Sequence, residues 1–444
     1  MPSPVRLRLL SSAGGTLLLL FVLSSSASAA PAGALPTAAP ASVHRLLERP
    51  AELSARLANV SPDVGAARAR VSEARAEASG SRLVPNPVLD ASLSAIPVSH
   101  ANNARFSASS AWSVGLSETI ELGKRGPRSA AADLRARAAD HYLVGTLSER
   151  IAAARAAMAN ALQLALRNAT LEASLADARH ATELERVRYE QKALSGMDYD
   201  RLLLELSSLQ SELEQSRAEY EGALAECSAR LSGSCDLSDA REEVLDQALP
   251  LGALSQDSAE LGKRPDLIGL ELEREASRSD AELARRRGIP DVTLRVGYTR
   301  DNSAGPEEAL DSVSVGLQLP LPISDHGQHD SAKALARAAE LEQERTAVLL
   351  GARSELSGLL QRKRALERTL GVLEKDSLPR AKSVLESTQR AFDDGGIALT
   401  DFLLARRSYV ALRLTLLEQR FELFSTRNDL YRVLGLDARA HENQ

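Results

Sequence analysis

The chain has 444 residues, of which 44% are hydrophobic but only 3% aromatic, a balance typical of long helices and coiled coils. Its net charge is −6 and it contains no basic block, which argues against a nucleic-acid-binding protein. Because the sequence also lacks any nucleophile–base, P-loop or zinc-protease motif, we expect neither enzymatic activity nor a cofactor.

The N-terminus has the pattern of an export signal over residues 1–29. Arg6 and Arg8 supply positive charge, Leu17–Leu23 form an apolar run, and Ala27–Ala29 resemble a cleavage site. That run is shorter than the roughly 20 residues that a membrane-spanning helix needs. Since no later segment comes closer, any crossing of a membrane is expected to be made by strands.

The first half of the mature chain begins, after a leader at 30–60, with a helix signal at Ser61-Pro62-Asp63. Serine is a good cap, proline suits the first turn, and an acid near the N-terminus favours the helix dipole. Apolar and polar residues then alternate, which predicts strands at about 88–96 and about 112–122, with Asn102 in the loop between them. Two long helices follow, of about 60 and about 30 residues.

The second half repeats this plan. Pro265 follows Pro62 by 203 residues, and Phe392 follows Tyr189 by the same interval. Strands are predicted at about 291–299 and about 312–321. Spacing preserved at so many positions indicates a duplication. The predicted organisation begins with an N-terminal segment at 30–60. The first repeat is expected at 61–231, a linker at 232–263, the second repeat at 264–435 and a C-terminal tail at 436–444.

The four predicted strands have a length of about 10 residues and one apolar face each, as strands of a membrane β-barrel do. Four strands cannot close a barrel, and lipid does not tolerate an open edge. We therefore expect three copies to contribute 12 strands. Trp112 and Tyr298 would then face lipid; ordinary sheet packing is the alternative. A secreted coiled-coil structural protein with small sheets at one end is the competing interpretation of the whole chain.

Several short motifs lie at or near the ends of the predicted strands and helices. In order, they are PNP (85–87), ELGKRG (121–126), RPDL (264–267), IPD (289–291), SVGLQLPLP (314–322) and RAFDDGGIALTDFLLARRSY (390–409). Together they give the chain a resemblance to the TolC-like outer-membrane efflux family. PNP and ELGKRG are most similar to the outer-membrane components of cobalt–zinc–cadmium efflux systems of the resistance-nodulation-division type, and the others are similar to the family generally.

This resemblance implies a mainly α-helical protein that forms a homotrimer. A 12-stranded barrel would lie in the lipid of the outer membrane of a Gram-negative bacterium, and an α-helical barrel would continue it through the periplasm. The linker and terminal segments would form an equatorial collar. The partners implied are a periplasmic adaptor protein and an inner-membrane resistance-nodulation-division pump. The expected function is a passive export duct for heavy-metal cations, with drug export or type I protein secretion as alternatives.

The resemblance also implies that the two helical tip turns contact the adaptor. Asp401 stands where relatives carry an acidic residue at the tunnel entrance, although a helix cap would explain the same aspartate. Lys192 stands where the second turn has Gly395, which makes the first turn the more divergent one. The candidate adaptor contacts are Arg188, Tyr189, Leu194, Ser195, Asp198, Leu202, Arg390, Phe392, Gly395, Gly396, Leu399, Asp401 and Phe402.

Two further groups of residues are candidates, one for a metal site and one for a disulfide. Asp325, His326, His329 and Asp330 form a His/Asp cluster suited in type to a divalent metal, but a strand-to-helix junction explains it better, so no metal site is predicted. Cys227 and Cys235 are the chain's two cysteines. In an exported protein they are suited to a local disulfide, with two free thiols as the alternative.

Overall fold

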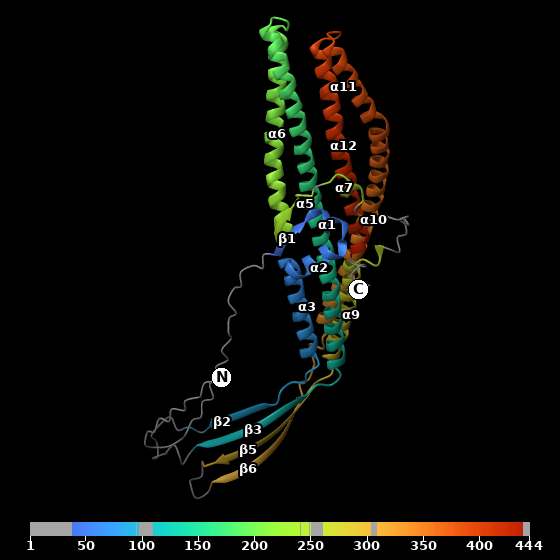
Figure 1. Ribbon diagram of the computed structural model, residues 1–444. Coiled ribbons are helices and arrows are strands. Elements are labelled where there is room, and N and C mark those ends of the chain that lie inside the picture. The colour runs from blue at the N-terminus through green and yellow to red at the C-terminus, as the bar shows by residue number, and fades with distance from the viewer. Residues whose placement is uncertain are drawn as a thin grey trace, which may run out of the picture. The chain divides into compact units, whose positions relative to one another are not determined.

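The computed structural model describes residues 38–94, 96, 110–239, 241–247, 249, 261–302 and 309–437 (Figure 1). The predicted export signal at 1–29, the loop around Asn102 and parts of the linker and the tail lie outside these residues. Within the described part of the chain, no helix combines the length and the apolar character needed to span a membrane.

The two halves of the chain have the same order of elements. The first half consists of α3 (Pro62–Ser81), β2 (Val88–Ser94), β3 (Ala111–Ile120), α5 (Arg125–Glu190) and α6 (Gly196–Leu231). The second half consists of α9 (Pro265–Arg286), β5 (Val292–Asp301), β6 (Leu310–Gln318), α10 (Gln328–Val372), the π-helical segment η2 (Leu373–Ser377), α11 (Leu378–Asp393) and α12 (Leu399–Leu434). This order agrees with the predicted duplication, which remains an interpretation of the sequence.

Helix α3 begins where its sequence predicts, but not by the expected cap. Ser61 is the N-cap residue, yet its side chain makes no capping hydrogen bond. The start is instead supported by Pro62, whose fixed φ suits the first helical turn, and by Asp63, which pairs with Arg150 at 3.1 Å.

The four strands form one antiparallel sheet in the order β2-β3-β5-β6. Each hairpin supplies two neighbouring strands, and the two hairpins join through β3 and β5, where Gly115 lies opposite Gly297. Strands β2 and β6 are the two edges of the sheet. Because side chains alternate along each strand, this register gathers most of the apolar residues of the four strands on one face.

This apolar face is exposed in the single chain. Val315 on β6 is 80% exposed and Leu89 on β2 is 70% exposed. Trp112 and Tyr298 lie on the same face with ring centroids 5.4 Å apart, and both side chains are more than a third exposed. The opposite face carries mainly serine, threonine and glycine, so the sheet separates an apolar surface from a polar one.

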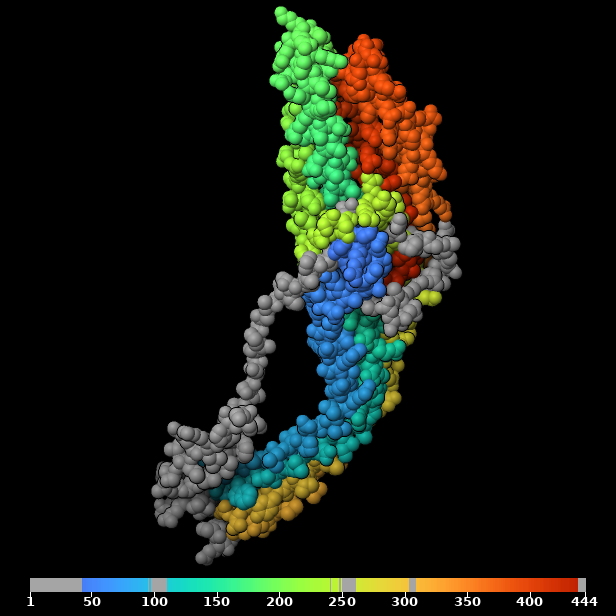
Figure 2. Space-filling view, viewed as in Figure 1, coloured from blue at the N-terminus to red at the C-terminus, as the bar shows by residue number. Residues whose placement is uncertain are grey.

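A set of short elements crosses the middle of the long helices (Figure 2). Strand β1 (Ala38–Ser42) pairs in parallel with β4 (Gly233–Asp236), and α1 (Val43–Glu48), α2 (Pro50–Val60) and α7 (Glu243–Gln247) pack beside them. These strands and helices were not predicted: they lie in the expected N-terminal segment at 30–60 and in the expected linker at 232–263. Strands β1 and β4 and helices α1 and α7 have at most 6 residues each, too few to show a periodic pattern, whereas α2, with 11 residues, was missed.

The main hydrophobic core lies at this crossing. Leu53 and Leu57 of α2 pack with Met158 of α5 and Phe424 of α12, all essentially inaccessible to solvent. A disulfide between Cys227 and Cys235 ties the end of α6 to β4. The core therefore joins the two halves of the chain through short segments that lie outside the two repeats.

Candidate functional site

The candidate site consists of the two turns at the far ends of the long helices. The first turn, residues 191–195, joins α5 to α6, and the second, residues 394–398, joins α11 to α12. Figure 1 shows both turns at the end of the molecule opposite the sheet. Among the described residues, these two turns are the loops at that end of the chain; the rest of the surface there consists of the sides of helices.

The two turns have the same backbone path although their sequences differ. Lys192 has a φ of 63° and Gly395, 203 positions later, has a φ of 73°. The N–H of Ala193 donates to the carbonyl of Arg188 at 2.8 Å, and that of Gly396 donates to Ala391 at 2.7 Å. A lysine thus adopts the left-handed conformation that usually requires glycine at a helix C-terminus. The substitution expected to make the first turn diverge leaves its fold intact.

Each turn is closed by a pair of stacked aromatic rings. Tyr189 and Tyr199 stack with centroids 4.8 Å apart and planes 5° from parallel. Phe392 and Phe402 stack in the equivalent place at 5.4 Å and 9°. The stacking fixes the distance between the two helices of each hairpin next to the turn, so the turn residues are held on a rigid base.

The two turns differ in the partners of their aspartates. In the first turn Ser195 is the N-cap of α6: its hydroxyl accepts the N–H of Asp198 at 3.1 Å and lies 2.7 Å from the Asp198 carboxylate, which also binds Arg201. In the second turn Ala398 is the N-cap and cannot do this. Asp401 is not the cap residue but lies in the first turn of α12, exposed, and no hydrogen bond or ion pair to its carboxylate is found in the described part of the chain.

A hydrophobic cluster holds the two tip hairpins together. Leu202, Phe392, Leu399 and Phe402 are all at most 9% exposed, so these four candidate adaptor contacts are buried within the chain. The aliphatic and aromatic side chains stabilise the tip and are not available to another protein. Of the other candidates, Leu194 and Asp198 are half-buried, while those that remain exposed are Arg188, Tyr189, Ser195, Arg390, Gly395, Gly396 and Asp401.

Arg188 also joins the two hairpins. Its guanidinium lies 5.9 Å from the ring centroid of Phe392 and 3.0 Å from the carboxylate of Glu185. Glu185 is buried, and its second carboxylate oxygen has no hydrogen-bond partner among the residues that the structure describes. Burial raises the pKa of the Glu185 carboxyl above its ordinary value, and nearby Asp393 raises it further while Arg188 lowers it. The contact between the hairpins therefore contains a titratable group.

Exposed apolar side chains surround the turns, and the sequence motifs did not single them out. They interrupt the polar faces of their helices, so counting the apolar residues along each face would have found them. These residues, each between 41% and 70% exposed, are Leu184, Val187, Met197, Leu203, Leu204, Val384 and Leu404.

A groove of about 870 Å³ lies between α5 and the α11–α12 hairpin below the turns. Its walls include Asp177, His180 and Tyr409. Arg406, also on the wall, is buried and donates to the backbone carbonyl of Ser174 at 2.7 Å, and its burial lowers its pKa. Arg406 thus holds α12 against α5 beside this groove.

The His/Asp cluster at the β6–α10 junction has structural contacts. Asp325 accepts the N–H of Gly327 at 2.9 Å, Gln328 accepts that of His326 at 2.9 Å, and Asp330 pairs with Arg287, the C-cap residue of α9. Among the described residues, no group of three or more histidine, cysteine, aspartate or glutamate side chains is placed to hold a metal ion. The cluster forms the turn that starts α10.

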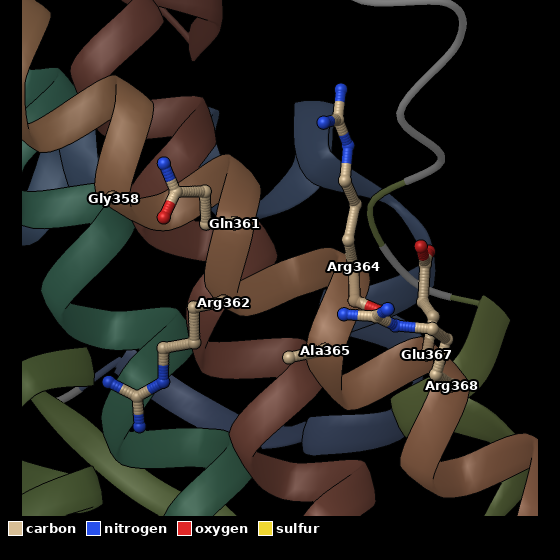
Figure 3. Close-up of a pocket in the computed structure, with 7 residues that line it drawn as sticks. All are labelled: Gly358, Gln361, Arg362, Arg364, Ala365, Glu367 and Arg368. Carbon is tan, nitrogen blue, oxygen red and sulfur yellow. The ribbon is translucent and has the colours of Figure 1, made fainter.

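A hollow with a volume of about 1050 Å³ lies beside α10 (Figure 3). All its lining residues come from this one helix, including Arg362, Arg364 and Arg368. Arg362 pairs with Glu422 of α12. A hollow lined by a single helix is an open surface depression and not an enclosed ligand site.

The chain is similar in sequence and in structure to known proteins. Residues 258–436 match the model of the family described as outer membrane efflux protein. The chain is 27% identical over 243 residues to the cobalt-zinc-cadmium resistance protein CzcC of Cupriavidus metallidurans, covering 52% of this chain and 53% of CzcC. The aligned part thus spans about half the length of that relative. This chain is a relative of the TolC-like outer-membrane efflux proteins.

Other similar proteins extend the comparison to nearly the whole chain. It is 24% identical over 404 residues to the pyoverdine export outer membrane protein OpmQ of Pseudomonas aeruginosa, covering 84% of this chain and 82% of OpmQ. The solved structure of CusC matches with a TM-score of 0.74 at 17% identity, covering 86% of this chain and 91% of CusC. The outer-membrane channel OprN matches with a TM-score of 0.72 at 20% identity, covering 90% and 94%.

These findings confirm the family resemblance inferred from the motifs. The fold is TolC-like and mainly helical. This similarity supports a location in the outer membrane of a Gram-negative bacterium, with an extension into the periplasm.

Proposed function

We propose that this protein is the outer-membrane channel of a tripartite efflux system and acts as a passive export duct. The observation that carries the proposal is the four-stranded sheet with one exposed apolar face and one polar face. A surface on which Val313, Val315 and Leu317 are each more than two-thirds exposed is stable against lipid but unfavourable in water.

The sheet also supports a trimer. Strands β2 and β6 are edges whose outward-facing backbone groups have no partner within the described chain. Lipid cannot satisfy such groups, so β6 of one copy must pair with β2 of the next. Three copies of four strands would give a closed barrel of 12 strands, a size in the range of known outer-membrane barrels. The long helices would continue it as an α-helical barrel.

The tip turns are proposed as the contact with a periplasmic adaptor. Tyr189 and Arg390 are exposed there, and so are apolar side chains such as Met197 and Leu204. Exposed apolar groups at the end of a rigid hairpin are suited to binding another protein. An inner-membrane resistance-nodulation-division pump would then supply the energy for export.

The proposed cargo is a heavy-metal cation. CzcC carries cobalt-zinc-cadmium resistance in its name, and the unpaired carboxylate of Asp401 would form a ring of three in a trimer. Such a ring at a narrow entrance attracts cations. Export of an organic solute is the second candidate, since OpmQ, which matches more of the chain, is named for pyoverdine export.

Growth of a strain that lacks this protein tests the proposal. The strain is challenged with zinc, cobalt, cadmium, nickel and copper. It is challenged separately with dyes, detergents and conditions under which siderophore accumulates in the cell. Selective sensitivity to metals, restored by the wild-type gene, is the expected result. Sensitivity only to organic compounds would retain the duct and overturn the metal assignment, whereas unchanged tolerance to every compound would contradict an efflux role.

A further inference from the structure

An ion pair crosses the polar face of the sheet. The Arg295 guanidinium of β5 donates to the Asp90 carboxylate of β2, although β3 lies between these two strands. The pair is only partly covered, with side-chain exposures of 55% for Arg295 and 34% for Asp90. It therefore lies on the surface of the face that would line the water-filled interior of the proposed barrel.

A glycine on the intervening strand makes this contact possible. Gly115 lies directly opposite Asp90, and a Cβ placed on it would be 2.8 Å from one Asp90 carboxylate oxygen and 3.0 Å from the other. Gly297 continues the same row on β5, and a Cβ there would lie 2.9 Å from the Ser314 hydroxyl. Any larger residue at 115 would push the Asp90 carboxylate away from Arg295. The strand between the two charges is thus free of side chains at the point where they meet.

The remaining polar face carries little charge. In the described parts of the four strands, the registers place three charged residues on it, Asp90, Arg295 and Asp301. The rest are serine, threonine, glycine and glutamine, with Val88, Ala111 and Leu310 at strand ends. Arg300 and Asp311 also form an ion pair, at 3.7 Å, but they lie on the apolar face. The Asp90–Arg295 pair is therefore the main fixed electrostatic feature of the surface that faces the interior.

We propose that the Asp90–Arg295 pair determines the charge specificity of the sheet part of the duct. This inference rests on the proposed function, since it requires the polar face to line a channel. Three unpaired aspartates in a trimer would hold divalent cations, and three unpaired arginines would hold carboxylates, because channel walls of low dielectric strengthen the field of a charge ring. Pairing neutralises both rings, so that charged solutes pass without being retained.

Ion selectivity in planar lipid bilayers tests the pair. The purified trimer is placed in a tenfold KCl gradient, and the zero-current potential gives the ratio of potassium to chloride permeability. Arg295→Gln is expected to raise this ratio by about threefold or more, and Asp90→Asn to lower it by a similar factor. The double variant D90N/R295Q is expected to return to the wild-type ratio. Zinc added at millimolar concentration should reduce the current of R295Q more than that of the wild type.

Arg300→Gln is the matched control, because it removes the same charge from the same strand on the opposite face. It is expected to leave the ratio unchanged. Wild-type-like selectivity of both R295Q and D90N in conducting channels would overturn the inference while leaving the duct in place. Membrane-inserted wild-type trimers without any conductance would contradict the proposed duct itself, and the inference would fall with it.

Discussion

Arg155 in the middle of α5 binds both carboxylate oxygens of Asp437, which follows α12 and lies 282 residues later in the chain, at 2.8 and 2.9 Å. Both side chains are buried, with exposures of 2% and 6%. The Arg155 guanidinium also lies 5.6 Å from the ring centroid of Tyr431. Because one partner belongs to each half of the chain, this ion pair joins the two halves where the short elements cross the long helices.

Removing one partner of this pair should destabilise the protein strongly. Asp437→Asn leaves the Arg155 charge buried without a counter-ion, and such a loss typically costs about 3–5 kcal/mol. We expect a lower midpoint of denaturant unfolding, followed by circular dichroism of the protein in detergent. The double variant R155M/D437L should recover most of the loss, because an apolar pair needs no counter-ion. A single variant as stable as the wild type would contradict this role.

Gly327 at the start of α10 should not tolerate a side chain. Its φ is 84°, and a Cβ there would lie 1.9 Å from the carbonyl oxygen of Ala284 in α9. We expect Gly327→Ala to cost about 2 kcal/mol or more, since backbone strain and a clash with a main-chain atom add. Thermal unfolding measures the loss. Gly358→Ala within α10 is the control: nothing lies near its Cβ, so the variant should be as stable as the wild type or slightly more so. Equal melting temperatures for G327A and wild type would contradict the claim that position 327 does not tolerate a side chain.

The left-handed lysine in the first tip turn is expected to be strained. Lys192 has a φ of 63°, a conformation that costs a residue with a Cβ roughly 1 kcal/mol relative to glycine. Lys192→Gly should therefore slow hydrogen exchange of the amides around residue 192 by a few-fold. Gly395→Lys, the reciprocal change in the second turn, should speed exchange there by a similar factor. Unaltered exchange in both variants would show that the turns do not bear this strain.

The contact between the two tip hairpins should be more stable in acid. Burial raises the pKa of Glu185 above its ordinary value of 4.5, so the folded tip favours the protonated carboxyl. Stability from this group is present below pH 4.5 and is lost as the pH rises through the raised value. Arg188 and Asp393 face the same carboxyl and shift it in opposite directions.

Hydrogen exchange of tip peptides at pH 5 and pH 7 measures this dependence. The comparison is made between wild type and Glu185→Gln at each pH, because intrinsic exchange rates then cancel. The wild type should lose protection relative to E185Q on going from pH 5 to pH 7. A ratio that does not change with pH would rule out titration of Glu185 in this range.

The sequence predicted the repeated elements well, because their patterns are long and regular. Alternation over residues 88–96 and 312–321 located strands that the structure places at Val88–Ser94 and Leu310–Gln318. The β6 strand starts two residues earlier than predicted, because Leu310 pairs with Asp301 and so extends the ladder. The long helices were also recognised, since Arg128–Cys227 contains no proline.

The sequence could not predict features that depend on contacts between distant segments. The parallel pairing of Ala38–Ser42 with Gly233–Asp236 joins two short runs without a strand pattern. The π-helical segment Leu373–Ser377 precedes Pro379 and has no counterpart in the first half. At the candidate site, the turns were located from the aromatic and aspartate positions. The burial of Phe392 and Phe402 was missed because it results from packing between the two hairpins.

The most direct test of the central claim is the environment of two neighbouring residues on β6. Val315 lies on the apolar face and Ser314 on the polar face, and the protein's two cysteines are joined in the disulfide, so an introduced cysteine would be its single free thiol. Single variants V315C and S314C carry a fluorescent label in outer-membrane vesicles. Brominated lipid should quench the label at 315, and an aqueous quencher the label at 314. Equal quenching of both labels by the aqueous quencher, with none by lipid, would contradict a membrane-spanning sheet.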